Sequence, residues 1–237
     1  MPRRSLFWPT LWAAFGFLLL LGLGTWQVQR LHWKEGLIAE RQAGIRAAPV
    51  ALPSTIGAAG PLEFHPVRAS GQFFNDKELY LNAQSLRGEA GFHIVTPLKL
   101  ADGAILLVDR GFVPTDRKEP QTRAAGELQG PVTITGLLRL PEGRPNWFTP
   151  DNDPARDLWF YVDVAAMAQA EKLDRVLPFY IEADASPNPG GQPQGGQSVI
   201  DLPNNHLQYA LTWYGLAAAL VVIYIGFARR RLGGDRP

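Results

Sequence analysis

The chain has 237 residues, a formal net charge of +1 and no cysteine. A net charge this small gives no indication of a nucleic-acid binder that works through a basic patch. The absence of cysteine excludes disulfides, thiolate metal sites, covalent c-type haem attachment and cysteine nucleophiles.

Two stretches of the chain are long enough and apolar enough to cross a membrane. Residues 6–28 and 207–228 contain no Asp, Glu, Lys or Arg. At about 1.5 Å per residue, each stretch would span roughly 30 Å of hydrocarbon as a helix. The first stretch exceeds the apolar core of a usual signal peptide, and no small-residue cleavage site follows it. We therefore predict that both are retained transmembrane helices.

Basic residues flank the two predicted spans at the ends of the chain. Two arginines precede the first span and four follow the second. Short basic flanks stay in the cytoplasm, whereas a long loop is exempt from this rule. Both termini are therefore expected in the cytoplasm. The expected order is a cytoplasmic N-terminus at 1–5, a span at 6–28, an external domain at 29–205, a span at 206–228 and a cytoplasmic basic tail at 229–237.

The start of the chain bears on which membrane is crossed. No transit-like segment precedes the first span, which begins within six residues of Met1. This favours a bacterial inner membrane, with the domain in the periplasm, over an imported mitochondrial protein. Membrane lipids are then the immediate neighbours of both helices.

The segment between the spans begins as helix and then changes to strand-like patterns. We expect the first helix to continue from Thr25 to about Glu40, followed by a Pro/Gly/Ala linker at 47–61. Runs rich in β-branched and aromatic residues predict six or seven strands, at 63–74, 77–84, 91–100, 104–113, 132–140, 158–163 and 175–184. Ala-Asp-Gly at 101–103 predicts a compact turn between two of them.

One short helix interrupts the strands, at 164–172, with Asp163 as its N-cap. Since short turns join most strands, we expect antiparallel pairing in a twisted sheet or a partly open barrel. The predicted fold class is a membrane protein in which two transmembrane helices flank a mainly-β (α+β) external domain. Residues 186–200 are too poor in apolar side chains to pack, so we expect a flexible tether there.

The sequence lacks the motifs of common hydrolases and nucleotide-binding enzymes. It contains no nucleophile elbow, no zinc-protease helix motif, no phosphate-binding loop and no dinucleotide fingerprint. We therefore expect a protein that is not an enzyme. Asp109 and Arg110 are expected to form an exposed ion pair at a strand end. His65 and His93 lie in strand patterns, and we interpret them as structural.

Two histidines lie at the predicted membrane boundary. His32 follows the first span by about one helical turn, and His206 stands at the start of the second. Because both spans open toward the external side, both imidazoles are expected near the same bilayer surface. A neutral imidazole nitrogen is a good axial ligand for haem iron. Helical spacing from His206 predicts one stripe of side chains: Tyr209, Ala210, Trp213 and Ala217.

The surroundings of His206 allow two interpretations. Trp213 would lie ~10 Å deeper than His206, below a simple headgroup belt of aromatic residues. Arg30, Lys34 and Arg41 are placed where they could pair with haem propionates. Interfacial anchoring and helix packing explain the same histidine, aromatic and small residues. Spacing alone therefore leaves both a ligand site and a plain membrane anchor open.

Five longer motifs carry a resemblance to a known family. They are "GTWQVQRLHWKEGLI", "GFHIVTPL", "VDRGFVP", "NWFTPDNDPARDLWFYVDVAAMA" and "NNHLQYALTWYGLA". In this order, and over nearly the whole chain, they resemble the Surfeit-locus-one (Shy-type) family of cytochrome c oxidase assembly factors. The RGW(V/I)P motif of that family is RGFVP here, which exchanges one aromatic residue for another.

The resemblance implies an assembly factor for haem-copper cytochrome c oxidase, with the oxidase catalytic subunit as partner and haem a synthase as a second candidate partner. Bacterial members of the family are thought to bind haem a and deliver it, with a histidine of the second span as ligand. That role falls on His206 as the ligand of the haem iron. The other expected haem-binding residues are Trp213, Tyr209, His32 and Arg30, although the family motif does not require a histidine at position 32.

An alternative function remains open within the same resemblance. The protein could be a scaffold that binds no haem and steadies an oxidase intermediate through its external domain. Substitutions at Arg110, Trp147 or Phe148 would then be the damaging ones. The carrier interpretation predicts instead that substitutions at His206 and Trp213 cause the loss of function.

Overall fold

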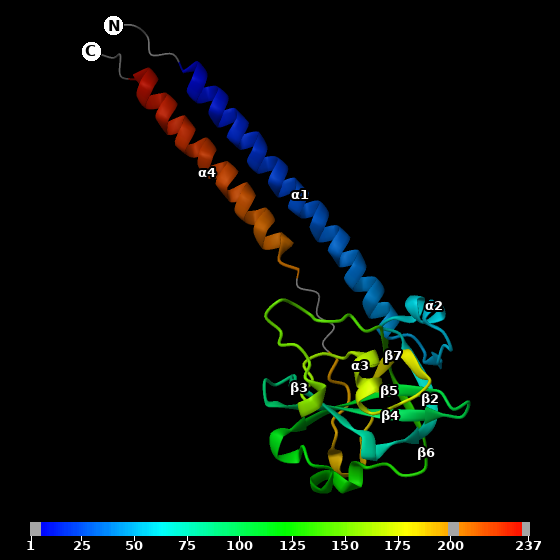
Figure 1. Cartoon of the computed structure of the whole chain (residues 1–237). Coiled ribbons are helices and arrows are strands. Elements are labelled where there is room, and N and C mark those ends of the chain that lie inside the picture. Colours follow the sequence, from blue (N-terminus) through cyan, green and yellow to red (C-terminus); the bar gives the residue numbers. More distant parts are fainter. Residues whose placement is uncertain (1–5, 199–203, 234–237) are drawn as a thin grey trace. The chain divides into compact units, whose positions relative to one another are not determined.

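The computed structural model describes residues 6–198 and 204–233. The chain divides into two compact units. Of the described residues, the helical unit holds those up to Glu40 together with those from 204 onward, and the strand-rich unit holds residues 41–198. Figure 1 shows the long helices of the first unit and the strands of the second.

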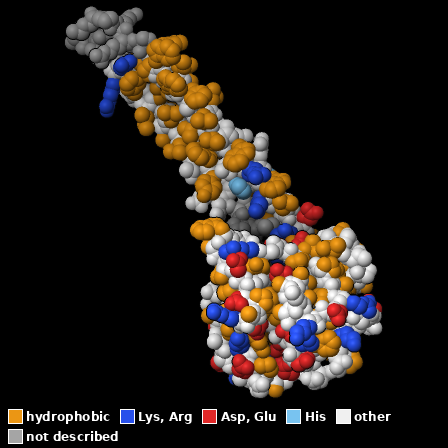
Figure 2. Space-filling model, viewed as in Figure 1, with side chains coloured by type: hydrophobic (Ala, Val, Ile, Leu, Met, Phe, Trp, Pro, Cys, Tyr) orange, Lys and Arg blue, Asp and Glu red, His pale blue; other side chains and the backbone are white. Residues whose placement is uncertain are grey.

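Two long helices make up the helical unit: α1 (Phe7–Ile45), which runs on into the strand-rich unit, and α4 (His206–Gly233). Both are long and apolar enough to cross a membrane. Within the 18-residue apolar stretch of each helix, only 6% of the stretch in α1 and 11% of the stretch in α4 is buried. A core helix of a soluble protein would bury that surface, so these exposed apolar side chains suit lipid. Figure 2 shows hydrophobic side chains along both helices, whereas charges of both signs are spread over the strand-rich unit.

Polar and small residues join α1 to α4. The hydroxyl oxygens of Thr10 and Tyr224 lie 2.5 Å apart, and those of Thr25 and Tyr214 lie 3.2 Å apart. Gly24 makes room for the second pair, because a Cβ at this position would lie 2.6 Å from the Tyr214 ring. Hydrogen bonds between side chains and the close approach of small residues are what hold helices together in lipid.

Five strands form a partly closed barrel. In ring order they are β2 (Pro66–Phe73), β6 (Pro131–Arg139), β7 (Val176–Ala183), β5 (Ile105–Pro114) and β4 (Ala90–Leu100). Three residue pairs between β2 and β4 close the ring. Outside it, β1 (Val50–Ala51) extends β2, and β3 (Leu79–Gln84) extends β4. The predicted mainly-β fold, flanked by two candidate membrane helices, is confirmed.

Most neighbouring strands are antiparallel, as predicted. The short β1 is parallel to β2, and within the barrel β5 and β7 are parallel. A long crossover that includes β6 and the helix α3 (Val164–Ala170) joins these two strands. A parallel pair requires such a crossover, whereas short turns produce antiparallel neighbours. Asp163 caps α3 as predicted, since its carboxylate accepts a hydrogen bond from the Ala166 N–H at 3.0 Å.

Strand β5 is buried on both faces and separates two hydrophobic clusters. Leu106 and Val108 belong to a cluster with residues from all five barrel strands, which is the barrel interior. Leu107, between them, belongs to a second cluster that includes Trp159 and Met167. Consecutive residues of a strand point to opposite faces, so the segment that carries Trp159 and Met167 covers the outer face of β5.

The predicted strand at 158–163 is wrong. Within the described part of the chain, this segment forms only isolated bridges, Leu81↔Trp159 and Asp153↔Leu158. Trp159 is fully buried, and its indole N–H donates to the Asp157 carboxylate at 2.8 Å. Trp159, one of the aromatic residues that suggested a strand, is instead buried in the cluster on the outer face of β5.

Two segments that were expected to be irregular carry more structure than their composition indicates. The linker 47–61 contains β1 and the short helix α2 (Ile56–Ala59). In the expected tether, Gln194 exchanges both backbone hydrogen bonds with Phe112 of β5, at 2.8 and 2.9 Å. The prediction that 186–198 does not pack is therefore wrong at this point, because backbone groups hold the segment without apolar side chains.

Several local predictions are confirmed. The first helix continues past Glu40 to the end of α1, and a turn at 101–103 joins β4 to β5.

The expected cytoplasmic residues 1–5, the end of the tether at 199–200 and the last part of the basic tail at 234–237 lie outside the described residues. Short 3₁₀ helices lie at Gly60–Leu62, Asn75–Lys77, Thr115–Arg117, Pro120–Gly126, Pro154–Arg156 and Pro189–Gly191.

Candidate functional site

His206 is the first residue of α4 and is half-buried. Its ring nitrogen Nδ1 lies 2.7 Å from Oε1 of Gln27 on α1. Because an amide oxygen only accepts, this hydrogen bond requires the proton on Nδ1, and the tautomer with that proton has its lone pair on Nε2. Among the described residues, none forms a hydrogen bond with Nε2. A partner on one nitrogen fixes the tautomer and orientation of a histidine that binds metal through the other.

The stripe predicted below His206 is only partly buried. Ala210 and Ala217 are 2% and 1% exposed, and Trp213 is half-buried. Tyr209 is 54% exposed and lies outside this buried stripe. Small residues therefore occupy the buried positions of α4, while Trp213 borders the same stripe about two turns below His206.

The face of α1 that carries Gln27 also carries two cations. Arg30 and Lys34 follow Gln27 by three and seven residues, which are spacings of one helical face. The Arg30 guanidinium lies 4.6 Å from the Trp33 ring centroid, a contact that orients the cation without neutralising it. Arg41, the third expected cation, lies 4.0 Å from the Phe64 ring in the strand-rich unit. Of the three cations, Arg30 and Lys34 therefore share the helical face of Gln27, and Arg41 lies in the other unit.

His32 is not brought together with His206. Its Nδ1 lies 3.3 Å from Oε2 of Glu35, and both of these side chains are largely exposed. Position 32 follows Gln27 by five residues, which places it about 140° around the helix from the side chain that contacts His206. The two histidines therefore lie on different sides of the helix pair.

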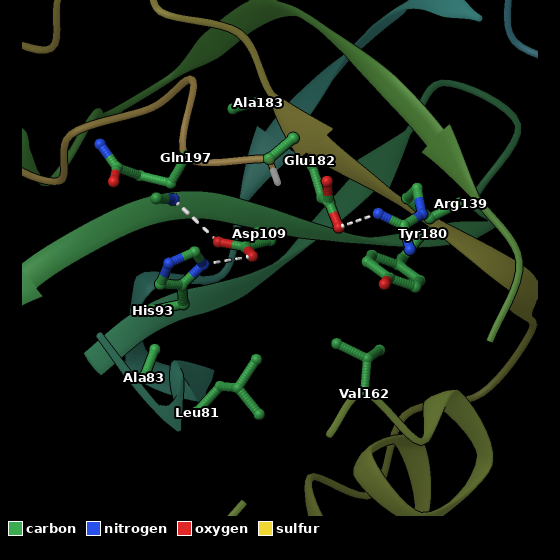
Figure 3. Close-up of a pocket in the computed structure, with 12 residues that line it drawn as sticks. Leu81, Ala83, His93, Asp109, Arg139, Val162, Tyr180, Glu182, Ala183 and Gln197 are labelled. Atoms are coloured by element: carbon green, nitrogen blue, oxygen red, sulfur yellow. Dashed lines mark hydrogen bonds and ion pairs between the residues drawn. The ribbon is translucent and has the colours of Figure 1, made fainter. Parts of the chain in front are cut away.

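A second cluster of polar side chains lines a pocket of about 230 Å³ in the strand-rich unit. Figure 3 shows His93 of β4 facing Asp109 of β5, with 2.7 Å between Nδ1 and Oδ2. It also shows Arg139 of β6 donating to Glu182 of β7, at 2.8 Å. Two ion pairs from four different strands thus meet in one pocket.

Burial and partners together set the charges in this pocket. Burial lowers the pKa of the His93 imidazole, but the Asp109 carboxylate outweighs it and leaves the pKa above its ordinary value. Burial raises the pKa of the Glu182 carboxyl, and the Arg139 charge offsets only part of that rise. No group of three or more His, Cys, Asp or Glu side chains suited to a metal ion occurs in the described residues.

Asp109 and Arg110 are not the exposed ion pair that the sequence predicted. They are 5% and 2% exposed, and they have different partners. Asp109 pairs with His93, whereas the Arg110 guanidinium lies 3.5 Å from the Glu78 carboxylate. Neighbouring residues of a strand point to opposite faces and do not pair with each other. The apolar residues on both sides of Asp109 and Arg110 were a signal of this, because a doubly buried strand must pair any charge it holds.

Sequence reasoning placed His206 at the helix mouth but missed its partner. Gln27 is an uncharged polar residue near the end of an apolar run, and such residues in membrane helices usually contact another helix. The polarity of Gln27 was therefore a usable signal. Its pairing with a residue 179 positions away was not visible in the sequence.

Comparison with known proteins gives a consistent assignment over most of the chain. A family model described as the SURF1 family matches residues 14–218. Surfeit locus protein 1 of Mus musculus is 41% identical over 235 residues, covering 90% of this chain and 76% of the mouse protein. Surfeit locus protein 1 of Homo sapiens is 40% identical over 214 residues, covering 84% and 70%. The SURF1-like protein of Monosiga brevicollis is 37% identical over 231 residues, covering 92% and 86%. The matched region includes both Gln27 and His206, and the chain belongs to the SURF1 family.

Proposed function

We propose that this protein is an assembly factor for haem-copper cytochrome c oxidase that binds haem a through His206 and passes it to the oxidase catalytic subunit. Membership of the SURF1 family supports the role in oxidase assembly. One observation carries the haem-binding part, the hydrogen bond from His206 Nδ1 to Gln27. It supports the proposal because it leaves Nε2 as a free, oriented nitrogen ligand.

Haem a is a cargo that suits a site at a membrane boundary, because its isoprenoid tail prefers lipid and its propionates prefer water. In this proposal Nε2 of His206 coordinates the haem iron. Trp213 and Tyr209 offer apolar contacts to the cargo, and Arg30 and Lys34 pair with the propionates. A single histidine ligand from the protein favours release over permanent retention, which is what delivery requires.

We further propose that the helices lie in a bacterial inner membrane with both termini in the cytoplasm. The arginines at the two ends of the chain support this orientation. The strand-rich unit then lies in the periplasm, and His206 and Gln27 lie near the outer bilayer surface. Haem a synthase and the oxidase catalytic subunit are the proposed donor and acceptor of the cargo there.

The test uses the full chain, expressed in a host that makes haem a, purified in mild detergent and examined by reduced-minus-oxidised spectra. Wild-type protein is expected to show a haem a signal, and His206→Ala to lose it. Gln27→Leu keeps the size of the side chain but removes the acceptor, so haem affinity should fall about 10–100-fold. His32→Ala is the matched control, an exposed histidine on α1 whose removal should change neither the spectrum nor the affinity.

Each outcome of this test has a definite meaning. An unchanged spectrum and affinity in His206→Ala would overturn the haem-binding proposal. Unchanged affinity in Gln27→Leu would remove the role of Gln27 while leaving His206 as the ligand. Wild-type protein that carries no haem but co-purifies with oxidase subunits would support the alternative function, a scaffold that holds an assembly intermediate.

A further inference from the structure

The loop that follows β6 presents two aromatic side chains to solvent, which we call the aromatic tip. Trp147 is 86% exposed and Phe148 is 70% exposed, the highest values among the large apolar side chains described in the strand-rich unit. Their rings meet edge to face, with centroids 5.6 Å apart. Large aromatic side chains are normally mostly buried, as Trp159 is in the same unit. The exposure of the aromatic tip therefore needs a physical reason.

The loop holds the aromatic tip in place with hydrogen bonds of its own. The Arg144 guanidinium donates to the backbone oxygens of Trp147 and Thr149, at 3.0 and 2.6 Å. It also lies 3.1 Å from the Asp151 carboxylate. The side-chain oxygen of Asn146 accepts from the N–H and the hydroxyl of Thr149, at 2.8 Å each. These contacts bridge the residues on either side of the two rings, so the tip is preformed.

We propose that the aromatic tip inserts into the interfacial region of the lipid bilayer and anchors the strand-rich unit to the membrane surface. Both ends of this unit continue along the chain into candidate membrane helices, so a bilayer is its permanent neighbour. Tryptophan is enriched at the headgroup level, where its indole finds both apolar and hydrogen-bonding surroundings. Phenylalanine beside it adds apolar area on the lipid side.

The size of the aromatic tip favours lipid over a protein partner. Two aromatic side chains bury about 300–500 Å² together, at roughly 150–250 Å² each. A stable protein interface needs about 800 Å² per partner around an apolar centre. Of the side chains next to the tip, Asn146, Thr149 and Asp151 are polar or charged, and only the small rings of the exposed Pro145 and Pro150 extend the apolar area. A bilayer interface accepts a small insertion because the rest of the unit stays in water.

The charge of the loop predicts which lipids it prefers. Residues 141–157 carry four carboxylates and two guanidinium groups, a net charge of −2. Anionic headgroups repel such a loop, so insertion depends on the two rings and is strongest in zwitterionic lipid. Simple electrostatic adhesion to the membrane would show the opposite dependence on lipid charge.

The absence of cysteine in the chain makes a single introduced cysteine a unique labelling site. Pro150→Cys places a nitroxide label two residues from Phe148, at an exposed position. The labelled full chain is reconstituted in phosphatidylcholine nanodiscs, and collision rates with molecular oxygen and with a water-soluble nickel chelate are measured by electron paramagnetic resonance. Leu86→Cys is the matched control, because Leu86 is an exposed apolar residue, 59% accessible, on another loop of the same unit.

The label at position 150 is expected to favour oxygen over the nickel chelate, and the label at position 86 to favour the chelate. Trp147→Ser combined with Phe148→Ser should bring the ratio at position 150 to that at position 86, and phosphatidylglycerol in the nanodisc should lower it. Equal ratios at the two positions, or a ratio that the serine variant leaves unchanged, would overturn the proposal. A label shielded from both reagents would indicate contact with a protein and would overturn it as well. None of these readouts depends on haem, so the result is independent of the proposed function.

Discussion

Replacing Glu78 with glutamine tests the buried charge network of the strand-rich unit. The side chains of Glu78 and Arg123 are each 1% exposed, and that of Arg110 is 2% exposed. The carboxylate oxygens of Glu78 lie 2.5 Å from Arg123 Nη2 and 3.5 Å from Arg110 Nη1. The Thr96 hydroxyl also donates to this carboxylate, at 3.2 Å. One buried carboxylate therefore serves two buried guanidinium groups.

The size of the effect follows from the charge that is left behind. Glutamine keeps the shape of Glu78, but among the described residues Arg123 then keeps an ion pair with Glu127 alone, at 2.6 Å, and Arg110 keeps none. Removing one partner of a buried ion pair costs about 3–5 kcal/mol, because the remaining charge stays desolvated. For a unit of about 160 residues, 1 kcal/mol shifts the thermal midpoint by about 2–4 °C. The expected drop in midpoint is therefore about 6–20 °C.

Thermal unfolding of the full chain in detergent, followed by circular dichroism, measures this drop. Glu142→Gln is the matched control, because its carboxylate is 66% exposed and its pair with Arg139 should contribute only about 0–1 kcal/mol. The double variant Glu78→Gln/Arg110→Met should lose less unfolding free energy than the sum of the two single variants, because Arg110→Met removes the charge that Glu78→Gln leaves without its partner. Equal midpoints for Glu78→Gln and Glu142→Gln would refute the reasoning.

Two further predictions concern the strand-rich unit. The raised pKa of His93 means that its pair with Asp109 stabilises the fold below the ordinary histidine pKa of about 6.5, and that this stability is lost as pH rises through the folded-state pKa. The midpoint difference between wild type and His93→Gln should therefore shrink as pH rises, and a difference independent of pH would contradict this. Gly111→Ala should lower the thermal midpoint more than Gly130→Ala. Both glycines have positive φ, so both substitutions strain the backbone. Only at Gly111 would the added Cβ also clash, 1.9 Å from the Gln194 carbonyl oxygen, because Gly130 faces open space. Equal drops would show that the segment around Gln194 does not pack against β5.

Local patterns predicted the elements that depend on neighbouring residues alone. Two charge-free runs predicted the membrane helices, because hydrocarbon excludes charge whatever the rest of the chain does. The turn at 101–103 and the Asp163 cap of α3 were predicted for the same reason, since each is stabilised within a few residues. The resemblance to the SURF1 family was likewise visible in five motifs read in chain order.

Burial and strand order were not predictable in this way. The segment at 158–163 has the composition of a strand, but Trp159 packs against strands that are distant in sequence. Arg110 looked like the end of a strand, yet its charge is balanced by Glu78, 32 residues earlier. The segment around Gln194 looked too polar to pack, but its backbone pairs with β5. In each case a partner far along the chain decides the outcome, and a local pattern does not identify that partner.

The same distinction between local properties and contacts of distant residues holds for the candidate site. The sequence by itself determined that His206 stands at the mouth of a membrane helix, because the end of an apolar run is a local property. Only the tertiary structure decided that Gln27 accepts the Nδ1 proton of His206 and that His32 lies on a different side of α1. The physical reason is that a hydrogen bond between two helices depends on their relative rotation and depth. Contacts along the whole length of the helix pair, such as those of Gly24 and Tyr214, set that rotation and depth.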